Sequence, residues 1–326
     1  MMRFKTSITA GLLLLSQTVT AEITNTDSVE DFVSHMVHQH HFNADQLRGL
    51  LQQVNIQQPI LAAMSKPAEG KPWAQYREIF LTETRISAGV QFWRNHQATL
   101  TAVAKSTGVP AEIIVAIIGV ETQYGANLGK YRVIDALATL GFAYPPRSEF
   151  FLKELEQFLL LSRDEQLDPL QPIGSYAGAM GLPQFMPSSF RHFARDYDHD
   201  HNRDIWHNGA DAIASVADYF VANDWQRGAE IALQVSARGN AYRRALSKGV
   251  KPDIKVARLR KLQVNIPARI SNQQPAKLLS YALADQQQLW LGLHNFYVIT
   301  RYNHSPLYAM AVLQLSQVIK HRLTTQ

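Results

Sequence analysis

The stretch from residue 109 to residue 125, with the sequence VPAEIIVAIIGVETQYG, constrains the fold more than any other. Residues 113–120 would be apolar on every face of a helix, so this helix must be enclosed by other elements rather than lie on the surface. Pro110 suits the first helical position, where its missing N–H costs nothing, and Gly125 can end the helix. The stretch therefore predicts a buried helix around which the rest of the chain is organised.

One acid, Glu121, continues the apolar stripe of this helix, since it follows Ile117 by four residues and Ile118 by three. Burial disfavours the ionised carboxylate, and so does the negative end of the helix dipole in the last turn. Both effects raise the pKa of Glu121, and an acid still protonated near neutral pH is what a general acid requires. The alternative is that Glu121 pairs with a basic group and only completes the packing. Its position alone leaves both interpretations open.

The first 21 residues have the features of a secretory signal peptide. Arg3 and Lys5 precede an apolar run over residues 8–15, and Val-Thr-Ala at 19–21 predicts cleavage after Ala21. The run is too short to anchor stably in a bilayer, and no later stretch is long and apolar enough to span one. We therefore expect an exported, soluble mature chain of residues 22–326.

The composition excludes several classes of protein. The chain has no cysteine, so it has no disulfide and no cysteine that could carry a lipid. The formal charge of +5 falls to about +3 without the leader, and no Lys/Arg block is dense enough to follow a phosphate backbone. The chain would thus tolerate an acidic polymer but gives no indication of nucleic acid. Its length suffices for a core of native proportions or for two or three subdomains.

The first half of the chain is strongly helical in pattern. Residues 28–57 and 83–105 are each expected to form a helix, and two more are expected after residue 125, separated at residues 144–146. The first of these segments contains a cluster of histidines: His35, His38, His40 and His41. Metal binding would need an acid at ligand spacing, which the segment lacks, so we interpret the histidines as part of a polar helix face.

A glycine-rich stretch, GSYAGAMGLPQFMPSS, covers residues 174–189. Its glycines allow close backbone approach, which fits either a tight loop between helices or one wall of a sugar-binding cleft. On the second interpretation, Ser175 and Gln184 supply hydrogen bonds, and Phe185 offers a ring on which a sugar can stack. The sequence leaves both interpretations open.

Oxygen-bearing side chains alternate in the next segment, and the candidate metal ligands are Asp196, Asp198, Asp200, Asn202 and Asp211. The spacing is that of an EF-hand-like calcium loop, which we assign to residues 196–211. Two departures weaken the match, because the expected glycine at the sixth position is His201 and the expected acid at the twelfth is His207. Asp204 or Asp211 would have to supply the closing acid. A solvated acidic loop without calcium is the alternative.

The helical periodicity weakens from residue 228 to residue 293. Four short runs there are compatible with β-strands: 229–235, 262–266, 278–283 and 288–293. We predict a helical catalytic region at 22–228, a small β-rich subdomain at 229–293, and a segment at 294–326 that returns to the catalytic core. Ser305-Pro306 is expected to start the last helix.

Four motifs, in this order, resemble those of the membrane-bound lytic murein transglycosylase B family: GVETQYG, SYAGAMGLPQFMPSS, the Asp-rich loop with IW, and VITRYNHSPLYAMAV. The resemblance covers about residue 31 to the C-terminus. It implies a mainly α fold, with a lysozyme-like helical catalytic core, an additional helical domain and a small β domain. It also implies a bacterial periplasmic enzyme that cuts the glycan strands of peptidoglycan, and it allows for partner proteins of cell-wall synthesis or remodelling. The family's founding members are lipoproteins, whereas this cysteine-free chain resembles a soluble member.

The resemblance places Glu121 at the family's single catalytic acid. It also places a set of residues along the substrate cleft: Tyr76, Arg147, Ser175, Gln184, Phe185, Tyr219, Tyr302, Asn303 and Tyr308. Arg147 matches one of a pair of cleft arginines, but Pro146 stands at the position of its neighbour. The family's recognition of the peptide stem therefore carries over only in part.

A reaction can be formulated with one acid. Ordinary glycosidases use two carboxylates across the scissile bond, whereas this sequence offers one convincing buried acid. We hypothesise that Glu121 protonates the leaving oxygen, that the muramic acid N-acetyl carbonyl stabilises the cationic carbon, and that Glu121 then activates the sugar's own C6 hydroxyl.

The expected product is a 1,6-anhydro sugar. No water is consumed, no cofactor takes part in catalysis, and structural Ca²⁺, where bound, only braces its loop. The alternatives are a lysozyme-type hydrolase with Asp198 or Asp211 as the base for water, and a non-catalytic peptidoglycan-binding protein.

Overall fold

The computed structural model describes residues 26–64, 71–283 and 286–325, so the predicted signal peptide at 1–21 lies outside the described residues. The helices are α1 (Thr26–His40), α2 (Ala44–Leu51), α3 (Gln58–Met64), α4 (Trp73–Phe80), α5 (Glu83–Asn95), α6 (Gln97–Thr107), α7 (Ala111–Thr122), α8 (Val133–Ala143), α9 (Ser148–Asp164), α10 (Pro187–Phe193), α11 (Gly209–Ala222), α12 (Val256–Lys261), α13 (His294–Tyr302) and α14 (Pro306–Thr325). The strands are β1 (Tyr131–Arg132), β2 (Ile173–Gly174), β3 (Ala232–Ala237), β4 (Ile254–Lys255), β5 (Val264–Asn265), β6 (Pro275–Ala282) and β7 (Gln287–Gly292).

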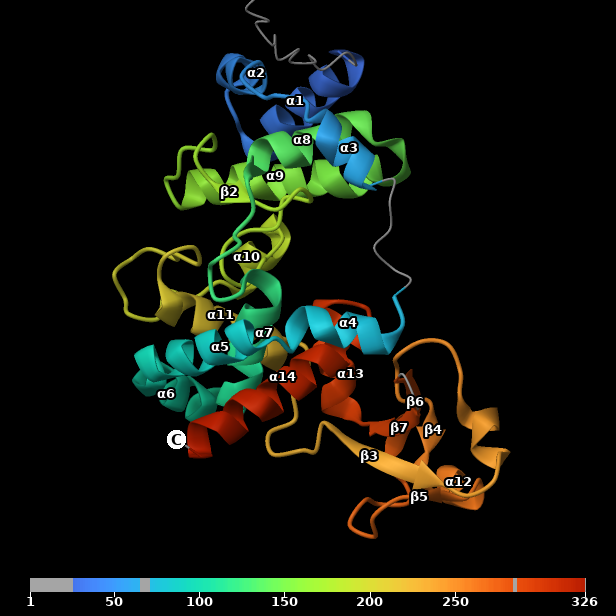
Figure 1. Cartoon of the computed structure of the whole chain (residues 1–326). Coiled ribbons are helices and arrows are strands. Elements are labelled where there is room, and N and C mark those ends of the chain that lie inside the picture. Colours follow the sequence, from blue (N-terminus) through green and yellow to red (C-terminus); the bar gives the residue numbers. More distant parts are fainter. Residues whose placement is uncertain (1–25, 65–70, 284–285, 326) are drawn as a thin grey trace, which may run out of the picture.

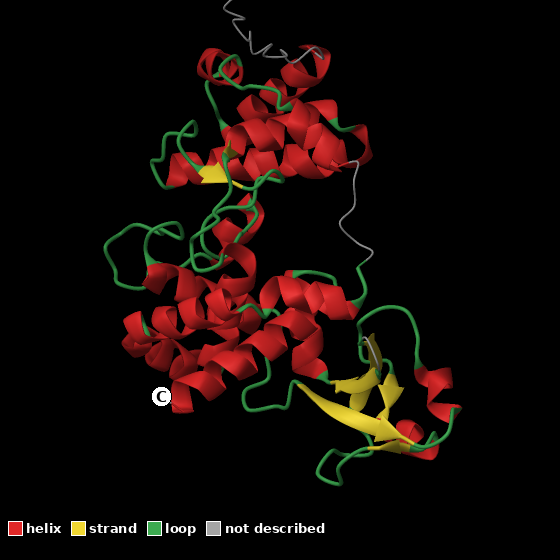
Figure 2. Ribbon diagram, in the orientation of Figure 1, coloured by secondary structure: helices red, strands yellow, loops and turns green. Residues whose placement is uncertain are grey.

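The described residues form two helical parts, a two-stranded β1–β2 ribbon and a small five-stranded sheet (Figures 1 and 2). One helical part contains α1, α2, α3, α8 and α9. The other contains α4 to α7 with α11, α13 and α14, and α10 lies between the two. Each part has its own cluster of buried apolar side chains. The prediction of a mainly α fold with a small β-rich part is confirmed.

Helix α7 is the buried helix that the sequence predicted. Residues 113–120 are all buried, and the helix packs against α14 and α5. It ends at Thr122, earlier than predicted, because Gln123 and Tyr124 already adopt left-handed backbone angles, with φ of 52° and 60°. No single described helix is long and apolar enough to span a membrane. Helices α6 and α7 together meet that test of length and composition, but they bend by 116°, and α7 lies inside the protein core.

Two of the predicted helices are each broken into two. The segment 28–57 is interrupted after α1, where His41 has φ of 58°, and α2 then starts with the Asn43 side chain accepting a hydrogen bond from the Gln46 N–H. The segment 83–105 is interrupted at His96, whose ring packs on Phe92. These breaks let the apolar faces of consecutive helices bury against different neighbours.

The small β part is an antiparallel sheet, in which the described strands follow the order β4-β6-β7-β3-β5. The predicted runs correspond to β3, β5, β6 and β7 with shifted boundaries, whereas β4 and α12 were not predicted. Leu291 of β7 lies opposite Leu278 of β6 and Leu233 of β3, and all three are buried in the same cluster. After the sheet, the chain returns to the helical core, where α14 covers α7. The division into domains at residues 228 and 293 stays a prediction.

Candidate active site

Glu121 lies in the last turn of α7, and its side chain meets α14. Its Oε1 atom accepts a 2.6 Å hydrogen bond from the hydroxyl of Tyr308, which is in the first turn of α14. Within the described residues, no lysine, arginine or histidine forms an ion pair with Glu121. The alternative in which Glu121 merely pairs with a basic group is therefore not what the structure shows.

Burial raises the pKa of Glu121 from 4.5 to about 7, and the hydrogen bond from Tyr308 works in the opposite direction. Burial also raises the pKa of Tyr308 well above its usual value, and the nearby Glu121 and Tyr302 reinforce the effect. Tyr308 therefore stays a hydrogen-bond donor at all working pH values. Glu121 can hold or release a proton near neutrality, as the sequence led us to expect.

Glu121 opens into a pocket of about 340 Å³. The remaining lining residues come from the segment after α7 and from the glycine-rich stretch: Asn127, Gly129, Lys130, Tyr131, Ser175, Tyr176 and Gln184. Ser175 and Gln184 were predicted to lie in the cleft, and the structure brings both to the same pocket as Glu121. Lys130 and Tyr176 were missed, although Tyr176 lies inside a quoted motif and Lys130 follows another closely.

The glycine-rich stretch folds back on itself. The Ser175 hydroxyl accepts hydrogen bonds from the N–H groups of Ala177 and Ala179, at 3.3 and 3.0 Å. A Cβ atom at Gly181 would approach the Ile205 carbonyl oxygen to 2.6 Å. The close approach that the glycines permit is thus to the protein's own backbone. The stretch is thus a tight loop, and Ser175, Tyr176 and Gln184 of this loop line the pocket, whereas its role in sugar binding stays a prediction.

Tyr302 and Tyr308 lie close to Glu121. The Tyr302 ring stacks on that of Tyr308, with the ring centroids 6.5 Å apart and the planes 10° from parallel. The Tyr302 hydroxyl donates a 2.6 Å hydrogen bond to the Pro183 carbonyl, and Tyr219 donates one of the same length to the Arg301 carbonyl. The first of these bonds ties α13 to the glycine-rich stretch, and the second ties α11 to α13.

The prediction that Phe185 offers a stacking face to a sugar is wrong in this structure. Only 2% of Phe185 is exposed, and its ring is enclosed by those of Phe193, Tyr219 and Tyr302. Burying an aromatic ring is strongly favourable, so Phe185 is retained in the core. Phe185 does not line the pocket, and its ring packs against Tyr219 and Tyr302.

The other predicted cleft residues lie farther out. Tyr76 of α4 packs between Trp73 and Phe80 and is close enough to Tyr308 to raise its pKa. Asn303 is exposed immediately after α13.

Arg147 is exposed, and its guanidinium lies over the Phe150 ring at 4.4 Å. The guanidinium also lies over the Phe151 ring, and Arg147 is not among the described residues that line the pocket around Glu121. Its predicted role in the cleft stays a prediction.

Three of the five candidate metal ligands come together. Carboxylate oxygens of Asp196, Asp198 and Asp211 all lie within 4.8 Å of one another. Asp211 is fully buried, and burial, with smaller contributions from the other two acids, raises its pKa to about 6. His201 makes the sharp turn with φ of 71°, so the missing glycine does not prevent the loop from closing.

The other two candidates are Asp200 and Asn202. The Asp200 carboxylate accepts a 2.8 Å hydrogen bond from the backbone N–H of Asn202 and lies outside the group of three. Their roles as ligands stay predictions. Of the two proposed closing acids, Asp211 belongs to the group, whereas Asp204 accepts hydrogen bonds from the N–H groups of Trp206 and His207.

Several known proteins are similar to this chain in sequence and fold. Residues 24–317 match the family model described as "Transglycosylase SLT domain". The chain is 42% identical over 308 residues to membrane-bound lytic murein transglycosylase B of Escherichia coli (strain K12). The matched region covers 91% of this chain and 84% of that protein. The solved structure of the soluble lytic transglycosylase SltB1 from Pseudomonas aeruginosa has a TM-score of 0.87 at 48% identity, covering 90% of this chain and 98% of that one. The E. coli lytic transglycosylase Slt35 in complex with calcium has a TM-score of 0.86 at 40% identity, covering 95% of this chain and 98% of that one.

Proposed function

The chain belongs to the membrane-bound lytic murein transglycosylase B family, and from this premise we propose how it cleaves peptidoglycan. It is a lytic transglycosylase, and the expected lysozyme-like fold is confirmed by the structural matches. The reaction that we propose breaks the β-1,4 bond between N-acetylmuramic acid and N-acetylglucosamine without water. It leaves a 1,6-anhydro-muramic acid end, and Glu121 is the only acid and base that the protein supplies.

One observation carries this proposal: within the described residues, Glu121 is the one carboxylic acid that lines the pocket. A hydrolase of the lysozyme type needs a second carboxylate near the scissile bond. Asp198 and Asp211, the earlier candidates for that role, lie together with Asp196 in the acidic loop and do not line the pocket. The geometry therefore favours a mechanism in which the substrate supplies the second reacting group.

In the first step, protonated Glu121 donates its proton to the glycosidic oxygen as the bond to C1 breaks. The N-acetyl carbonyl of the muramic acid stabilises the positive charge at C1. Glu121 is now ionised, and the Tyr308 hydroxyl stabilises its charge through the 2.6 Å hydrogen bond. A pKa of about 7 suits both halves of this exchange, since the group must give up its proton and recover one at the same pH.

In the second step, ionised Glu121 removes the proton from the C6 hydroxyl of the same sugar, and this oxygen bonds to C1. The C6 hydroxyl is tethered to the ring that it attacks, so its effective concentration is high. The proton returns to Glu121, and the enzyme is ready for another cycle. We propose glycan strands of peptidoglycan as the partner, the periplasm as the location, and a chain that is exported with a cleaved leader and carries no lipid.

Replacing Tyr308 by Phe should shift the pH dependence of catalysis. Its hydroxyl lowers the pKa of Glu121, so its removal raises that pKa and moves the alkaline limb of kcat/KM from near pH 7 to higher pH. The maximal rate should fall about 10-fold, because the ionised acid loses a hydrogen bond. Tyr302→Phe is the matched control, since that hydroxyl bonds to Pro183 rather than to Glu121. A limb that shifts equally in both variants would contradict the assignment.

The acidic loop fits a calcium ion, because three clustered carboxylates without a cation repel one another. Asp196, Asp198 and Asp211 would hold Ca²⁺, which would brace the loop and take no part in bond breaking. Removing Ca²⁺ with a chelator should lower the melting temperature by about 3 °C or more. Asp198→Asn should abolish most of this response, whereas Asp45→Asn, at a fully exposed acid in α2, should preserve it. A melting temperature that is indifferent to Ca²⁺ would leave the loop as a solvated acidic segment.

Release of soluble fragments from purified peptidoglycan by the chain from residue 22 to residue 326 tests the proposed function. Release of fragments when the protein is no more abundant than the bonds to be cleaved would support an enzymatic function. Pelleting with peptidoglycan without the release of fragments would instead indicate a binding protein.

A further inference from the structure

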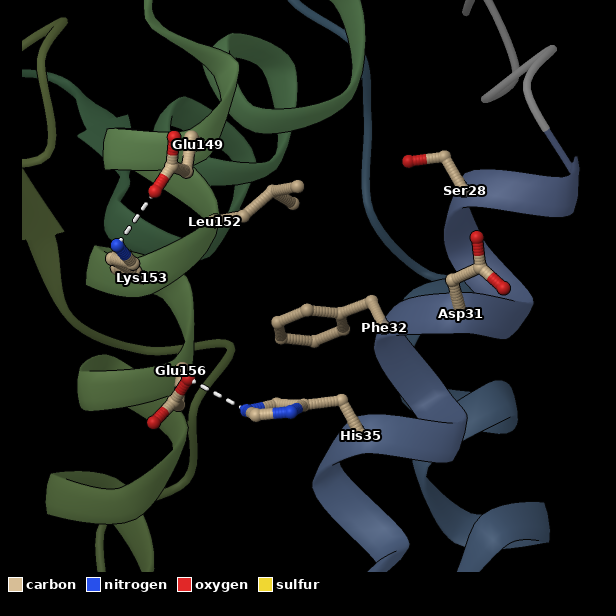
Figure 3. Close-up of a pocket in the computed structure, with 8 residues that line it drawn as sticks. All are labelled: Ser28, Asp31, Phe32, His35, Glu149, Leu152, Lys153 and Glu156. Carbon is tan, nitrogen blue, oxygen red and sulfur yellow. Dashed lines mark hydrogen bonds and ion pairs between the residues drawn. The ribbon is translucent and has the colours of Figure 1, made fainter. Parts of the chain in front are cut away.

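A second hollow, of about 350 Å³, lies between α1 and α9 (Figure 3), and it shares no lining residue with the pocket around Glu121. Its walls include His35 of α1 and Glu156 of α9, which point toward each other. Neither residue lines the Glu121 pocket. His35 belongs to the histidine cluster that the sequence led us to interpret as a polar helix face.

Two imidazoles converge on one carboxylate at this place. His35 Nε2 lies 3.0 Å from Glu156 Oε2, and His40 Nε2 lies 2.9 Å from Glu156 Oε1. One ligand atom from each of these three residues lies within 4.8 Å of the other two. The acid that the local sequence lacked is therefore supplied by a helix more than 100 residues away along the chain.

The Glu156 carboxylate has no permanent cation of its own among the described side chains. Lys153, one turn earlier in α9, is bonded to Glu149 at 2.7 Å instead, as Figure 3 shows. The carboxylate also accepts a hydrogen bond from the Gln157 side-chain amide, at 3.4 Å. The side chains of Glu156 and His40 are only 18% and 25% exposed, so the charge of this acid is partly shielded from water. A positive ion between the three groups would balance it.

We propose that His35, His40 and Glu156 form a binding site for a divalent transition-metal ion, with zinc as the ion of choice. Two imidazole nitrogens and one carboxylate oxygen are a donor set that suits Zn²⁺ and not Ca²⁺ or Mg²⁺, which prefer oxygen ligands. With metal–ligand bonds of about 2.0 to 2.1 Å, neighbouring ligand atoms in a tetrahedral site lie about 3.3 Å apart. The two nitrogen–oxygen distances, 3.0 and 2.9 Å, need to widen by a few tenths of an ångström, and the ligand atoms of all three residues lie within 4.8 Å of one another. Water from the hollow can complete the coordination.

The ion would join the first described helix to α9. Phe32 and Met36 of α1 already pack in the same apolar cluster as Phe151 and Leu155 of α9. A metal that binds the folded state alone stabilises it, in proportion to the logarithm of its concentration over its dissociation constant. The site therefore acts on the stability of the N-terminal helical part. It is separate from the proposed catalytic reaction and does not depend on it.

The test is titration of Zn²⁺ into the untagged chain from residue 22 to residue 326, with Ca²⁺ held in excess to occupy the acidic loop. We expect one Zn²⁺ per chain with a dissociation constant below about 10 μM, and a melting temperature higher by about 3 °C or more at saturation. The chain has no cysteine, so thiolates cannot account for the binding. Cleavage of peptidoglycan should be unchanged by Zn²⁺ at these concentrations.

Substitutions of the three proposed ligands show whether Zn²⁺ binds at this site or elsewhere on the protein. His35→Ala, His40→Ala and Glu156→Gln should each weaken Zn²⁺ binding at least about 100-fold and remove the rise in melting temperature. His38→Ala is the matched control, because this exposed histidine is on the same helix and outside the cluster. The proposal is overturned if no Zn²⁺ binds below about 100 μM, or if the three variants bind it as tightly as the control. Circular dichroism of each variant would show that the loss is not due to unfolding.

Discussion

Replacing Glu121 by Gln is expected to lower kcat on peptidoglycan by about 1,000-fold or more, with little change in KM. The amide keeps the shape of the side chain but can neither donate a proton to the leaving oxygen nor accept one from the C6 hydroxyl. General acid–base catalysis contributes about 100-fold to 10,000-fold to a step, and here one group serves both steps. Within the described residues, no second acid lines the pocket to take over the role.

Glu112→Gln is the matched control for this experiment. Glu112 lies in the first turn of the same helix and is paired with Lys320 at 2.6 Å, away from the pocket. Its substitution makes the same chemical change and should leave kcat within about twofold of the parent chain. If Glu121→Gln retained near-normal activity while folded, Glu121 could not be the acid.

Stability shows whether the Glu121→Gln variant is folded. The pKa of Glu121 is raised from 4.5 to about 7 in the folded state, so the folded protein binds the proton more tightly than the unfolded chain. The free energy of unfolding therefore falls as the pH rises from about 4.5 to 7, and the penalty is fully present above pH 7. At pH 8 the variant should be more stable than the parent by up to about 3 kcal/mol, and this difference should vanish below pH 4. Lost activity with increased stability identifies a catalytic effect.

Replacing Gly129 by Ala should destabilise the protein by about 3 to 5 kcal/mol and impair the cleft. Gly129 has φ of 101°, and a Cβ atom there would overlap the carbonyl group of Gly174 and approach the Ser175 nitrogen to 2.6 Å. Both obstacles are backbone atoms, so no side chain can move aside. The Tyr131 strand pairs with Gly174 here, and Ser175 lines the pocket. The added methyl group would force the two walls apart.

Gly228→Ala separates the overlap from the backbone strain. Gly228 also has a positive φ, of 70°, but a Cβ atom there would meet nothing within 4 Å. This change should cost only about 1 to 2 kcal/mol, the penalty for a left-handed alanine. Chemical denaturation measures both variants. If both variants lost the same free energy of unfolding, the walls of the pocket would be less rigid than the close contact between Gly129 and Gly174 implies.

Local patterns were enough to predict the central helix and its acid. An apolar run on every helical face predicts burial, and burial of Glu121 predicts the direction of its pKa shift without knowledge of its neighbours. The tyrosine that bonds to it could not be derived in this way. Tyr308 lies 187 residues farther along the chain, and only the packing of α14 on α7 brings the hydroxyl to the carboxylate. The resemblance to a family placed Tyr308 in the cleft but gave it no partner.

The errors have the same origin. Phe185 follows two cleft residues closely in sequence, but the backbone turns at Gln184, where φ is 50°, and directs the ring into the core. The histidines of α1 lacked an acid within their own segment, and α9 supplied one from afar. The break at His41 depends on a left-handed residue that is not glycine, which gives no signal in the sequence. Contacts distant along the chain and unusual backbone angles thus account for what the sequence did not reveal.

The source of the oxygen at the new sugar end decides between the two enzyme mechanisms. Peptidoglycan would be digested with the chain from residue 22 to residue 326 in water enriched in the heavy oxygen isotope, and the fragments would be weighed by mass spectrometry. We predict fragments that end in 1,6-anhydro-muramic acid, one water lighter than the reducing form and without the heavy isotope. Reducing ends that carry the heavy isotope would mean that water attacks C1, and a second carboxylate would then have to be found.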